Sequence, residues 1–324
     1  MSSHAVGSEG RTGVALAVRA RKRKTNLALL SMLIPGTLVL LIFTYVPMPL
    51  GLIIAFKHIR YGNNFFQTIF GSPWTGLKNF EFLFKTPDAW RITRNSLFYN
   101  SMFIVLGNTA AVSVAIALDG IRAKRAARFY QNVMFLPWFF SWVVISTLAF
   151  SFLSIDLGVL NRVLPQLGLR PVDWYIEPGY WPAILIFVNL WKYTGYGSVV
   201  YFAAIAGIDP TYFEASALDG ASRWQTIRRI MIPLISYIII IQVLLAVGRI
   251  FFSDFGLFFN VTRNNGALYP WTDVIDTYVY RALTNTQDMG LAAAAGTYQA
   301  LVGFVLVLAT NLVVRRIDPE KSLF

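Results

Sequence analysis

The chain has 324 residues, of which 56% are hydrophobic and 14% are charged, and its mean hydropathy is +0.55. A water-soluble domain would carry about 25% charged residues, so the composition excludes an ordinary soluble protein. Cysteine is absent, which excludes disulfides, thiolate metal sites and cysteine nucleophiles. Only two histidines occur, His4 and His58, and they exclude a histidine-rich metal site.

The net charge of +12 is compatible with a nucleic-acid-binding protein, but its distribution argues against that class. Much of the positive charge lies in short segments beside apolar runs, where it orients a membrane protein. Residues 1–26 are predicted to form a basic cytoplasmic tail without a cleavable signal peptide. This tail carries Arg11, Arg19, Arg21, Lys22, Arg23 and Lys24.

Six apolar segments follow, each long enough for a helix that crosses a bilayer, which needs about 20 residues. They are 27–56, 95–118, 129–153, 181–207, 233–258 and 289–314. Small residues in the second and sixth segments, such as Gly107, Ala111 and Gly296, favour close helix packing. The predicted fold class is therefore all-α, a polytopic bundle of six transmembrane helices over 27–314 with a short tail at 315–324.

The distribution of Lys and Arg predicts the orientation of this bundle. With both termini inside, segments 1–26, 119–128, 208–232 and 315–324 carry 16 Lys or Arg in 71 residues. The opposite segments, 57–94, 154–180 and 259–288, carry 10 in 95 residues. The positive-inside rule therefore predicts that both termini are cytoplasmic. The first outer segment is rich in aromatic residues and is predicted to form a short amphipathic helix or a small packed cap.

The cytoplasmic segment 208–232 has the local signals of two short helices. Asp209 before Pro210 is a good helix start, and Thr211 with Glu214 has capping-box spacing. Gly220 would end the first helix, and Ser222 with Gln225 repeats the capping-box spacing. Pro233 is predicted to mark the start of the fifth span. The segment is either an amphipathic helix on the membrane surface or an elbow that docks into a partner protein.

This segment resembles the cytoplasmic loop of type I ABC importer permeases. That family's pattern is Glu-Ala-Ala, three residues, Gly, nine residues, then Ile-x-Leu-Pro. The chain has Glu214-Ala215-Ser216, Gly220 and Ile230-Met231-Ile232-Pro233 at the same spacing, and Asp219-Gly220-Ala221 matches the usual Asp-Gly-Ala. It departs from the pattern at Ser216, Ile227 and Ile232, which are small or volume-conserving changes. The resemblance covers roughly residues 95–314.

The resemblance implies that the elbow is a coupling element that sits in a cleft of an ATPase subunit. It also implies a second, similar permease subunit, two ATP-binding cassette subunits and an extracytoplasmic solute-binding protein, in a bacterial cytoplasmic membrane. ATP and Mg would be bound by the ATPase subunits, because this chain has no G-x-x-x-x-G-K-[ST] phosphate loop. The implied coupling residues are Tyr212, Phe213, Glu214, Ala215, Ser216, Leu218, Asp219, Gly220, Ala221 and Trp224.

Two strong bases, Lys192 and Arg249, fall inside predicted spans, where charged side chains are costly and usually face a cavity, a partner or the interface. Aromatic residues beside Lys192 would suit sugar rings. Lys192 could instead pair with Asp254 or reach the membrane surface, and Arg249 could pair across a subunit interface. The candidate substrate pathway comprises Asn189, Trp191, Lys192, Tyr193, Tyr196, Arg249 and Asp254.

The runs W-K-Y-T-G-Y-G and, from Thr272 to Arg281, T-D-V-I-D-T-Y-V-Y-R resemble the polysaccharide-permease branch of the sugar importers. That resemblance implies an acidic oligosaccharide such as alginate as cargo. Amino acids, peptides, neutral sugars and phosphate esters stay open as alternative cargo, as does a secondary transporter or channel. An enzyme is disfavoured because its only candidates, Asp273 and Asp276, are better explained as loop or cap residues. No cofactor, metal or nucleic acid is expected in this chain.

Overall fold

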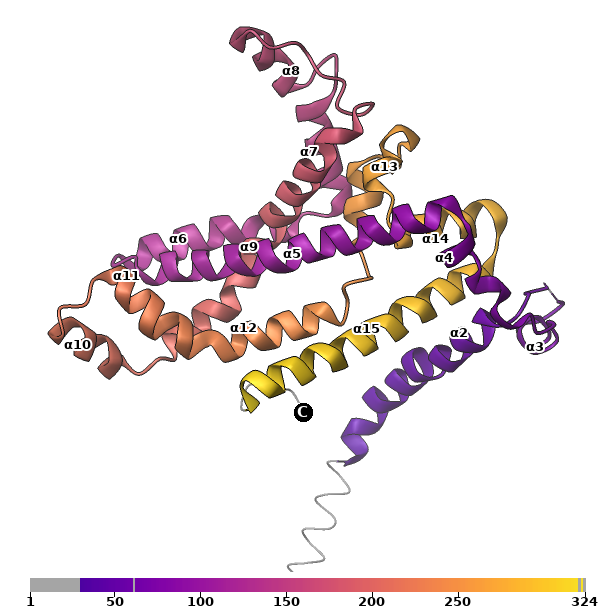
Figure 1. The fold of residues 1–324 in the computed structure, drawn as a ribbon, viewed down its shortest axis with the longest axis horizontal. Helices are drawn as coiled ribbons and strands as arrows, with labels where there is room; N and C mark the ends of the chain where they lie inside the picture. Colours follow the sequence, from indigo (N-terminus) through magenta and orange to yellow (C-terminus); the bar gives the residue numbers. More distant parts are fainter. Residues whose placement is uncertain (1–29, 61, 320–321, 323–324) are drawn as a thin grey trace, which may run out of the picture.

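The computed structural model describes residues 30–60, 62–319 and 322, and the regular structure of these residues is helical apart from one isolated bridge between Lys57 and Trp74. The all-α prediction is confirmed over this part of the chain, whereas the predicted tail 1–26 lies outside it. The longer helices are α2 (Pro47–Ala55), α5 (Pro87–Asp119), α6 (Lys124–Phe135), α7 (Trp142–Leu153), α9 (Trp181–Ala206), α10 (Pro210–Leu218), α12 (Ile232–Val247), α14 (Ile275–Thr286) and α15 (Met289–Ile317) (Figure 1).

Shorter helical turns connect these elements. They are η1 (Leu41–Tyr45), α3 (Phe65–Phe70), η2 (Gly76–Phe80), α4 (Phe82–Lys85), η3 (Leu136–Phe139), α8 (Val159–Val163), η4 (Leu164–Leu167), η5 (Pro178–Tyr180), α11 (Arg223–Thr226), η6 (Ile227–Met231), η7 (Leu257–Val261), η8 (Gly266–Leu268) and α13 (Tyr269–Thr272).

Four of the described helical stretches are long and apolar enough to cross a membrane: Leu30–Ala55, Pro87–Asp119, Arg223–Val247 and Met289–Arg316. They lie where the first, second, fifth and sixth spans were predicted. The bent pair Lys124–Phe139 and Trp142–Leu153 lies at the third. α9 lies at the fourth, and its 26 residues are long enough to cross, although Asn189 and Lys192 make it less apolar.

The fifth predicted span agrees with α12 at its start but ends earlier than predicted. α12 begins at Ile232 with Pro233 in its first turn, as predicted, and helical backbone also continues before it through η6 and α11 back to Arg223. Proline has no N–H for the helical hydrogen bond, and the π-turn η6 lies directly before this site. The helix ends at Val247, and the chain then turns with the Arg249 N–H bonded to the Ala246 carbonyl, so it does not continue to 258.

The third predicted span is broken and does not form one straight helix. α6 and η3 form one arm and α7 the other, and the two arms meet at 99°. In Figure 1, α6 runs alongside α5 whereas α7 turns away from the bundle toward α8. The break at Phe140 and Ser141 therefore redirects the chain within the apolar stretch.

α5 and α9 form the central pair of the bundle and pack side by side over much of their length (Figure 1). Small residues permit this approach. Ala111 and Ala115 of α5 are buried, and a Cβ atom added to Gly197 of α9 would lie only 3.4 Å from the Ala111 methyl group. α15 packs against both α2 and α12. The predicted role of small residues in close helix packing is thus confirmed for α5.

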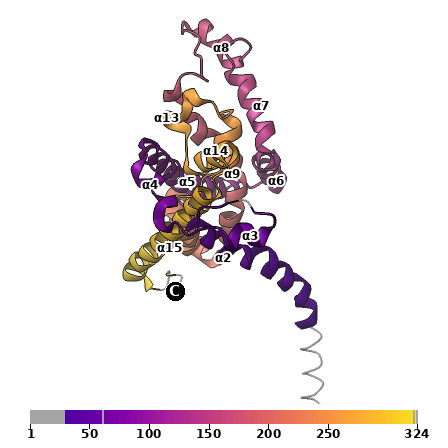
Figure 2. The ribbon, with the colours of Figure 1, turned by 90° about the vertical axis from the view of Figure 1, so that its right-hand side faces the viewer.

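The two ends of the bundle differ in content. α10 and α11 lie at one end of the long helices, whereas α3, α4 and α14 lie at the opposite end (Figure 1). We call them the elbow end and the far end. Figure 2 shows α13 and α14 close to the far end of α5, with α8 beyond them. The aromatic segment 57–94 contains the short helices α3, η2 and α4 and the first turns of α5.

Candidate functional site

The elbow, residues 209–232, begins with a local cap. The Asp209 carboxylate accepts hydrogen bonds from the Thr211 N–H and hydroxyl, both at 2.9 Å. These bonds hold the pKa of Asp209 below its usual range because they favour the charged carboxylate. Asp209 is therefore the cap of α10, and the predicted capping box between Thr211 and Glu214 is wrong.

Gly220 ends α10 in a left-handed conformation with φ at +69°. The Ala221 N–H bonds to the Ser216 carbonyl at 2.9 Å and the Gly220 N–H bonds to the Ala217 carbonyl at 3.1 Å. This pair of bonds is a Schellman motif, which satisfies the last carbonyls of the helix and favours glycine at this position. The predicted helix stop at Gly220 is confirmed.

The second elbow helix begins with the predicted capping box. The Gln225 side chain accepts from the Ser222 N–H at 2.7 Å, and the Ser222 hydroxyl accepts from the Gln225 N–H at 3.4 Å. From there the chain continues without a break through η6 into α12. A displacement of the elbow is therefore passed to a spanning helix through continuous helical backbone.

One face of the elbow is fixed to the bundle. Phe213 and Ile227 pack against a buried cluster that includes Tyr201, Ile205 and Met231. Ser216, which replaces the family's second alanine, is buried and its hydroxyl lies 3.3 Å from that of Thr226. The serine thus joins α10 to α11 from the inside, and Ala221 lines a small cavity beneath them.

The other face of the elbow is exposed, and it carries large apolar side chains that no other part of the described chain covers. Leu218 is 90% exposed, Tyr212 is 51% exposed and Trp224 is 67% exposed. Glu214, Ala215 and Asp219 are exposed beside them. The described ion pairs do not include Glu214. An exposed apolar side chain with carboxylates around it is typical of a protein-binding surface.

A groove of about 350 Å³, lined by polar as well as apolar side chains, lies between α5, α9 and α12. Asn189, Tyr193, Gly197 and Tyr201 line it from α9, at the four-residue spacing of one helix face. Asn100 and Asn108 line it from α5, and Gln242 and Arg249 line it from the end of α12. Amide and hydroxyl groups beside the Tyr193 ring are suited to a sugar, which offers hydroxyls and an apolar ring face.

Arg249 is the one charged residue among the described residues that line this groove. It is exposed, and the described ion pairs do not include it. A guanidinium without a carboxylate partner can bind a ligand carboxylate through two parallel hydrogen bonds. The groove therefore combines one exposed cation, within electrostatic reach of Asp276, with neutral side chains.

The other predicted pathway residues do not line the groove. Lys192 and Tyr196 point toward the break between η3 and α7, where the Tyr196 ring stacks on Trp138 at 3.9 Å between centroids. Trp191 is 39% exposed and lies near Phe140. Asp254 accepts a hydrogen bond from the Tyr193 hydroxyl at 2.5 Å, and the described ion pairs do not join it to Lys192. The structure thus brings together Asn189, Tyr193 and Arg249.

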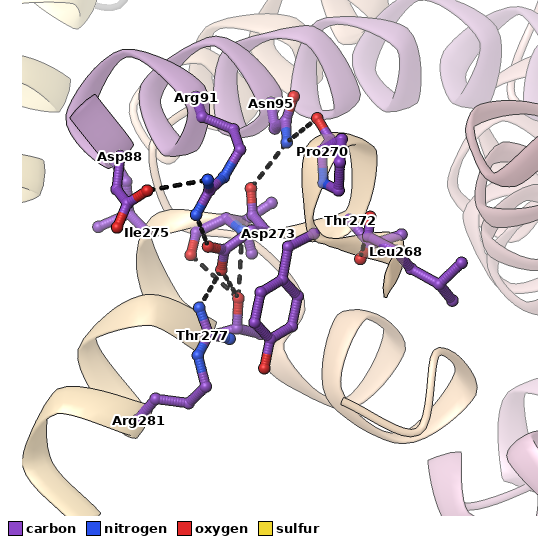
Figure 3. A network of polar contacts seen from close by, with 12 residues as sticks. Asp88, Arg91, Asn95, Leu268, Pro270, Thr272, Asp273, Ile275, Thr277 and Arg281 are labelled. Atoms are coloured by element: carbon purple, nitrogen blue, oxygen red, sulfur yellow. Dashed lines mark hydrogen bonds and ion pairs between the residues drawn. The ribbon is translucent and has the colours of Figure 1, made fainter. Parts of the chain in front are cut away.

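The far end contains a polar network that the sequence reasoning missed (Figure 3). The Asp273 side chain is fully buried and accepts from Arg91 at 2.9 Å and from Arg281 at 2.5 Å. Thr277 donates to the same carboxylate at 3.1 Å. Arg91 also pairs with Asp88 at 2.8 Å, and the Asn95 amide donates to the Asp273 carbonyl at 2.9 Å. These contacts tie the first turns of α5 to α13 and α14.

The Asp276 carboxylate has hydrogen-bond partners that differ from those of Asp273. The Asp276 carboxylate accepts from the Ser253 N–H at 2.8 Å and from the Gln299 amide at 3.3 Å. Burial raises the pKa of Asp276, and these hydrogen bonds oppose that shift. Both carboxylates connect segments that are distant in sequence, which agrees with the structural role favoured from the sequence.

Comparison with known proteins identifies relatives of the whole described bundle. Residues 107–319 match the family described as binding-protein-dependent transport system inner membrane component. The protein LplB of Bacillus subtilis is 30% identical over 93% of this chain and 92% of its own length. The polygalacturonan/rhamnogalacturonan transport permease YteP of the same organism is 29% identical over 89% and 88%. The lactose permease LacF of Rhizobium radiobacter is 26% identical over 72% and 76%.

Solved structures give the same assignment of fold. A chain of a bacterial ABC transporter involved in the import of the acidic polysaccharide alginate is 32% identical, with a TM-score of 0.81, over 92% of this chain and 98% of that chain. A chain of an alginate ABC transporter in complex with an alginate pentasaccharide-bound periplasmic protein is 31% identical, with a TM-score of 0.80, over 92% and 97%.

Proposed function

Because this chain belongs to the family of binding-protein-dependent transport system inner membrane components, it is a multi-pass permease subunit of an ABC importer for sugars, and we propose that its cargo is an acidic oligosaccharide such as alginate. The permease alternates between outward- and inward-facing states, and separate ATPase subunits drive the change. Its own residues bind the sugar and transmit movement, and they do not hydrolyse ATP.

The observation that carries this proposal is Arg249 in the groove between α5, α9 and α12. An acidic oligosaccharide presents one carboxylate on each sugar residue, and a single unpaired guanidinium can bind one of them bidentately. The amides of Asn189 and Gln242 and the Tyr193 ring then contact hydroxyls and the sugar face. The acidic cargo of two relatives, polygalacturonan and alginate, supports the same choice.

The exposed elbow face is the proposed contact with an ATPase subunit. Leu218 would enter an apolar pocket of that partner, with Tyr212 and Glu214 at its edge. Because α10 is joined to α11 and the elbow is packed on the bundle, closure of the ATPases would move it as one body. ATP and Mg would be held by two such subunits, with no cofactor in this chain.

The proposed assembly also contains a second permease subunit and an extracytoplasmic solute-binding protein. Apolar side chains along α7 are exposed, for example Val143 at 63% and Phe152 at 49%, and they would be covered by lipid or the second permease. With the elbow on the cytoplasmic side, both termini are cytoplasmic and the far-end segments 57–94, 154–180 and 259–288 face the solute-binding protein. The membrane is the cytoplasmic membrane of a bacterium.

The direct test is uptake by the reconstituted complex of acidic and neutral oligosaccharides of equal length. We expect ATP-dependent uptake that favours the acidic sugar. A preference for the neutral sugar would assign the chain to neutral cargo, as in the lactose permease relative, and uptake without any ATPase subunit would refute the coupling role of the elbow.

A further inference from the structure

The break in the third span creates free carbonyls inside an apolar stretch. The arm formed by α6 and η3 ends at Phe139, and α7 starts at Trp142 after a bend of 99°. The last carbonyls of a helix have no partner within the helix. In lipid an unsatisfied backbone group is costly because no water is present to replace the lost hydrogen bond. The break therefore requires donors from elsewhere in the molecule.

Lys192 of α9 supplies these donors. Its ammonium group donates to the Trp138 carbonyl at 3.1 Å and to the Phe140 carbonyl at 2.5 Å. The residue is 6% exposed. The rings of Trp138, Trp142 and Tyr193 surround the ammonium at 5.1 to 5.9 Å from their centroids. Carbonyl oxygens and aromatic faces are its direct partners, and the Asp254 carboxylate lies within electrostatic reach of the ammonium group.

The rest of the W-K-Y-T-G-Y-G run fits the same break. At Gly195 an added Cβ would lie 1.9 Å from the Met134 carbonyl oxygen, so only glycine allows α9 to approach α6 this closely. One residue later, Tyr196 stacks flat on Trp138, with 7° between the ring planes. On the N-terminal side of α7, the Ser141 hydroxyl accepts from the Val144 N–H at 3.3 Å. Both sides of the break are thereby capped.

The chain uses the same chemistry at a second site. Lys57 is 3% exposed and donates to the carbonyls of Ile69 and Phe70, at 2.9 and 3.0 Å, at the end of α3. The Trp74 ring lies 5.1 Å from its ammonium group. A buried lysine that caps a helix end beneath an aromatic ring is thus a recurrent device in this fold, and Lys57 provides a matched comparison away from the groove.

We propose that Lys192 is a positioning residue that fixes the angle of the broken third span, and that it does not contact the cargo. The inference deepens the proposed function, because the break is connected to the groove through Tyr193. The Tyr193 ring faces Lys192, while Tyr193 also lines the groove and donates to Asp254. Lys192 therefore positions Tyr193, which lines the groove, without lining the groove itself.

The test uses the assembled importer with the partner subunits made free of cysteine, since this chain has none. Val133→Cys and Leu148→Cys put spin labels on exposed sites of the two arms, which are 50% and 41% exposed. We expect one narrow distance distribution in the parent and in Lys192→Arg, which keeps two donors. Lys192→Met should broaden it, whereas Lys57→Met should leave it narrow.

Transport kinetics separate positioning from cargo contact. Lys192→Met should lower the turnover number about tenfold for acidic and neutral oligosaccharides alike, with KM nearly unchanged, because unsatisfied buried carbonyls disorder the wall of the groove. Two results would overturn the proposal. One is an unchanged distance distribution in Lys192→Met, and the other is a higher KM for the acidic sugar alone with an unchanged turnover number. If Lys192→Met does not assemble, Lys192→Gln, which loses the charge and has a shorter side chain, takes its place in both measurements. The distance measurement stands even if the cargo is not an acidic sugar.

Discussion

The elbow end and the far end of the bundle are stabilised in different ways. At the elbow, each helix start and stop depends on residues within six positions, such as Ser222 with Gln225. At the far end, Arg91 reaches Asp273 across 182 residues of sequence. The elbow exposes an apolar face for a partner, whereas the far end buries a carboxylate between two guanidinium groups. The elbow is thus built from local contacts, whereas the far end joins segments that are distant in sequence.

The largest expected effect is on the far-end network. Asp273→Asn removes the buried charge between Arg91 and Arg281 and should lower the free energy of unfolding by about 3 kcal/mol, because two partly buried guanidinium groups lose a shared counter-charge. Thermal unfolding in detergent measures it. Asp88→Asn is the control, since Asp88 is 41% exposed and its pair with Arg91 should contribute about 0.5 kcal/mol. Equal effects of both substitutions would contradict a central role for Asp273.

The next largest effect concerns the bend of the elbow. A Cβ atom added by Gly220→Ala would contact no neighbouring atom. The cost of the substitution is therefore that of a left-handed backbone at alanine, about 1–2 kcal/mol, which lowers the population of the bent elbow roughly tenfold. Transport and cargo-stimulated ATP hydrolysis should fall by a similar factor while membrane insertion stays intact. Gly207→Ala, just before the elbow with φ at −86°, should have little effect. If Gly220→Ala is silent, the elbow does not need its bend.

A smaller effect is expected at the exposed elbow face. Leu218→Ser should weaken ATPase binding by about 1 kcal/mol or more, because a buried apolar anchor is lost at the interface. Thermal stability of the free chain should not change, since Leu218 is 90% exposed. Co-purification with the ATPase measures the loss. Leu169→Ser, which is 55% exposed outside the elbow, is the control and should bind the ATPase normally.

Glu214→Gln tests the charge on the same face. Glu214 is exposed, so its removal should leave insertion unchanged but lower transport through a weaker electrostatic contact with the ATPase. The difference in transport between the parent and Glu214→Gln should shrink as the salt concentration is raised, because salt screens the exposed Glu214 charge in the parent. Transport that equals the parent at all salt concentrations would remove Glu214 from the interface.

The smallest effect is a pH dependence at Asp276. Burial raises the pKa of Asp276 in the folded chain, so its contribution to stability is fullest below the unfolded value of about 3.9 and declines as pH rises. Asp276→Asn removes this titration and can still accept the bonds from Ser253 and Gln299. The variant should match the parent at acid pH and gain stability over it at neutral pH. A gain that is greatest at acid pH would reverse the sign and reject this explanation.

Sequence reasoning succeeded where a signal is local. The caps at Asp209 and Ser222, the stop at Gly220 and most helical segments follow from spacing and apolar length. It failed where partners are remote or are main-chain atoms. The sequence identified Lys192 as a costly charge that needs a partner. Its partners are backbone carbonyls, and because every residue has a carbonyl, the side-chain sequence could not show which ones would be used. The bend at Phe140 depends on Lys192 and Gly195 of another helix, so the local sequence did not reveal it.

The most direct test of the account is cargo discrimination by Arg249. Uptake of acidic and neutral oligosaccharides of equal length should be compared in the reconstituted parent importer and in Arg249→Met, with Arg249→Lys as the variant that keeps the charge. We expect Arg249→Met to lose the preference for the acidic sugar, Arg249→Lys to keep part of it, and uptake of the neutral sugar to be similar in all three. An acidic preference that persists in Arg249→Met would contradict the assignment of the groove.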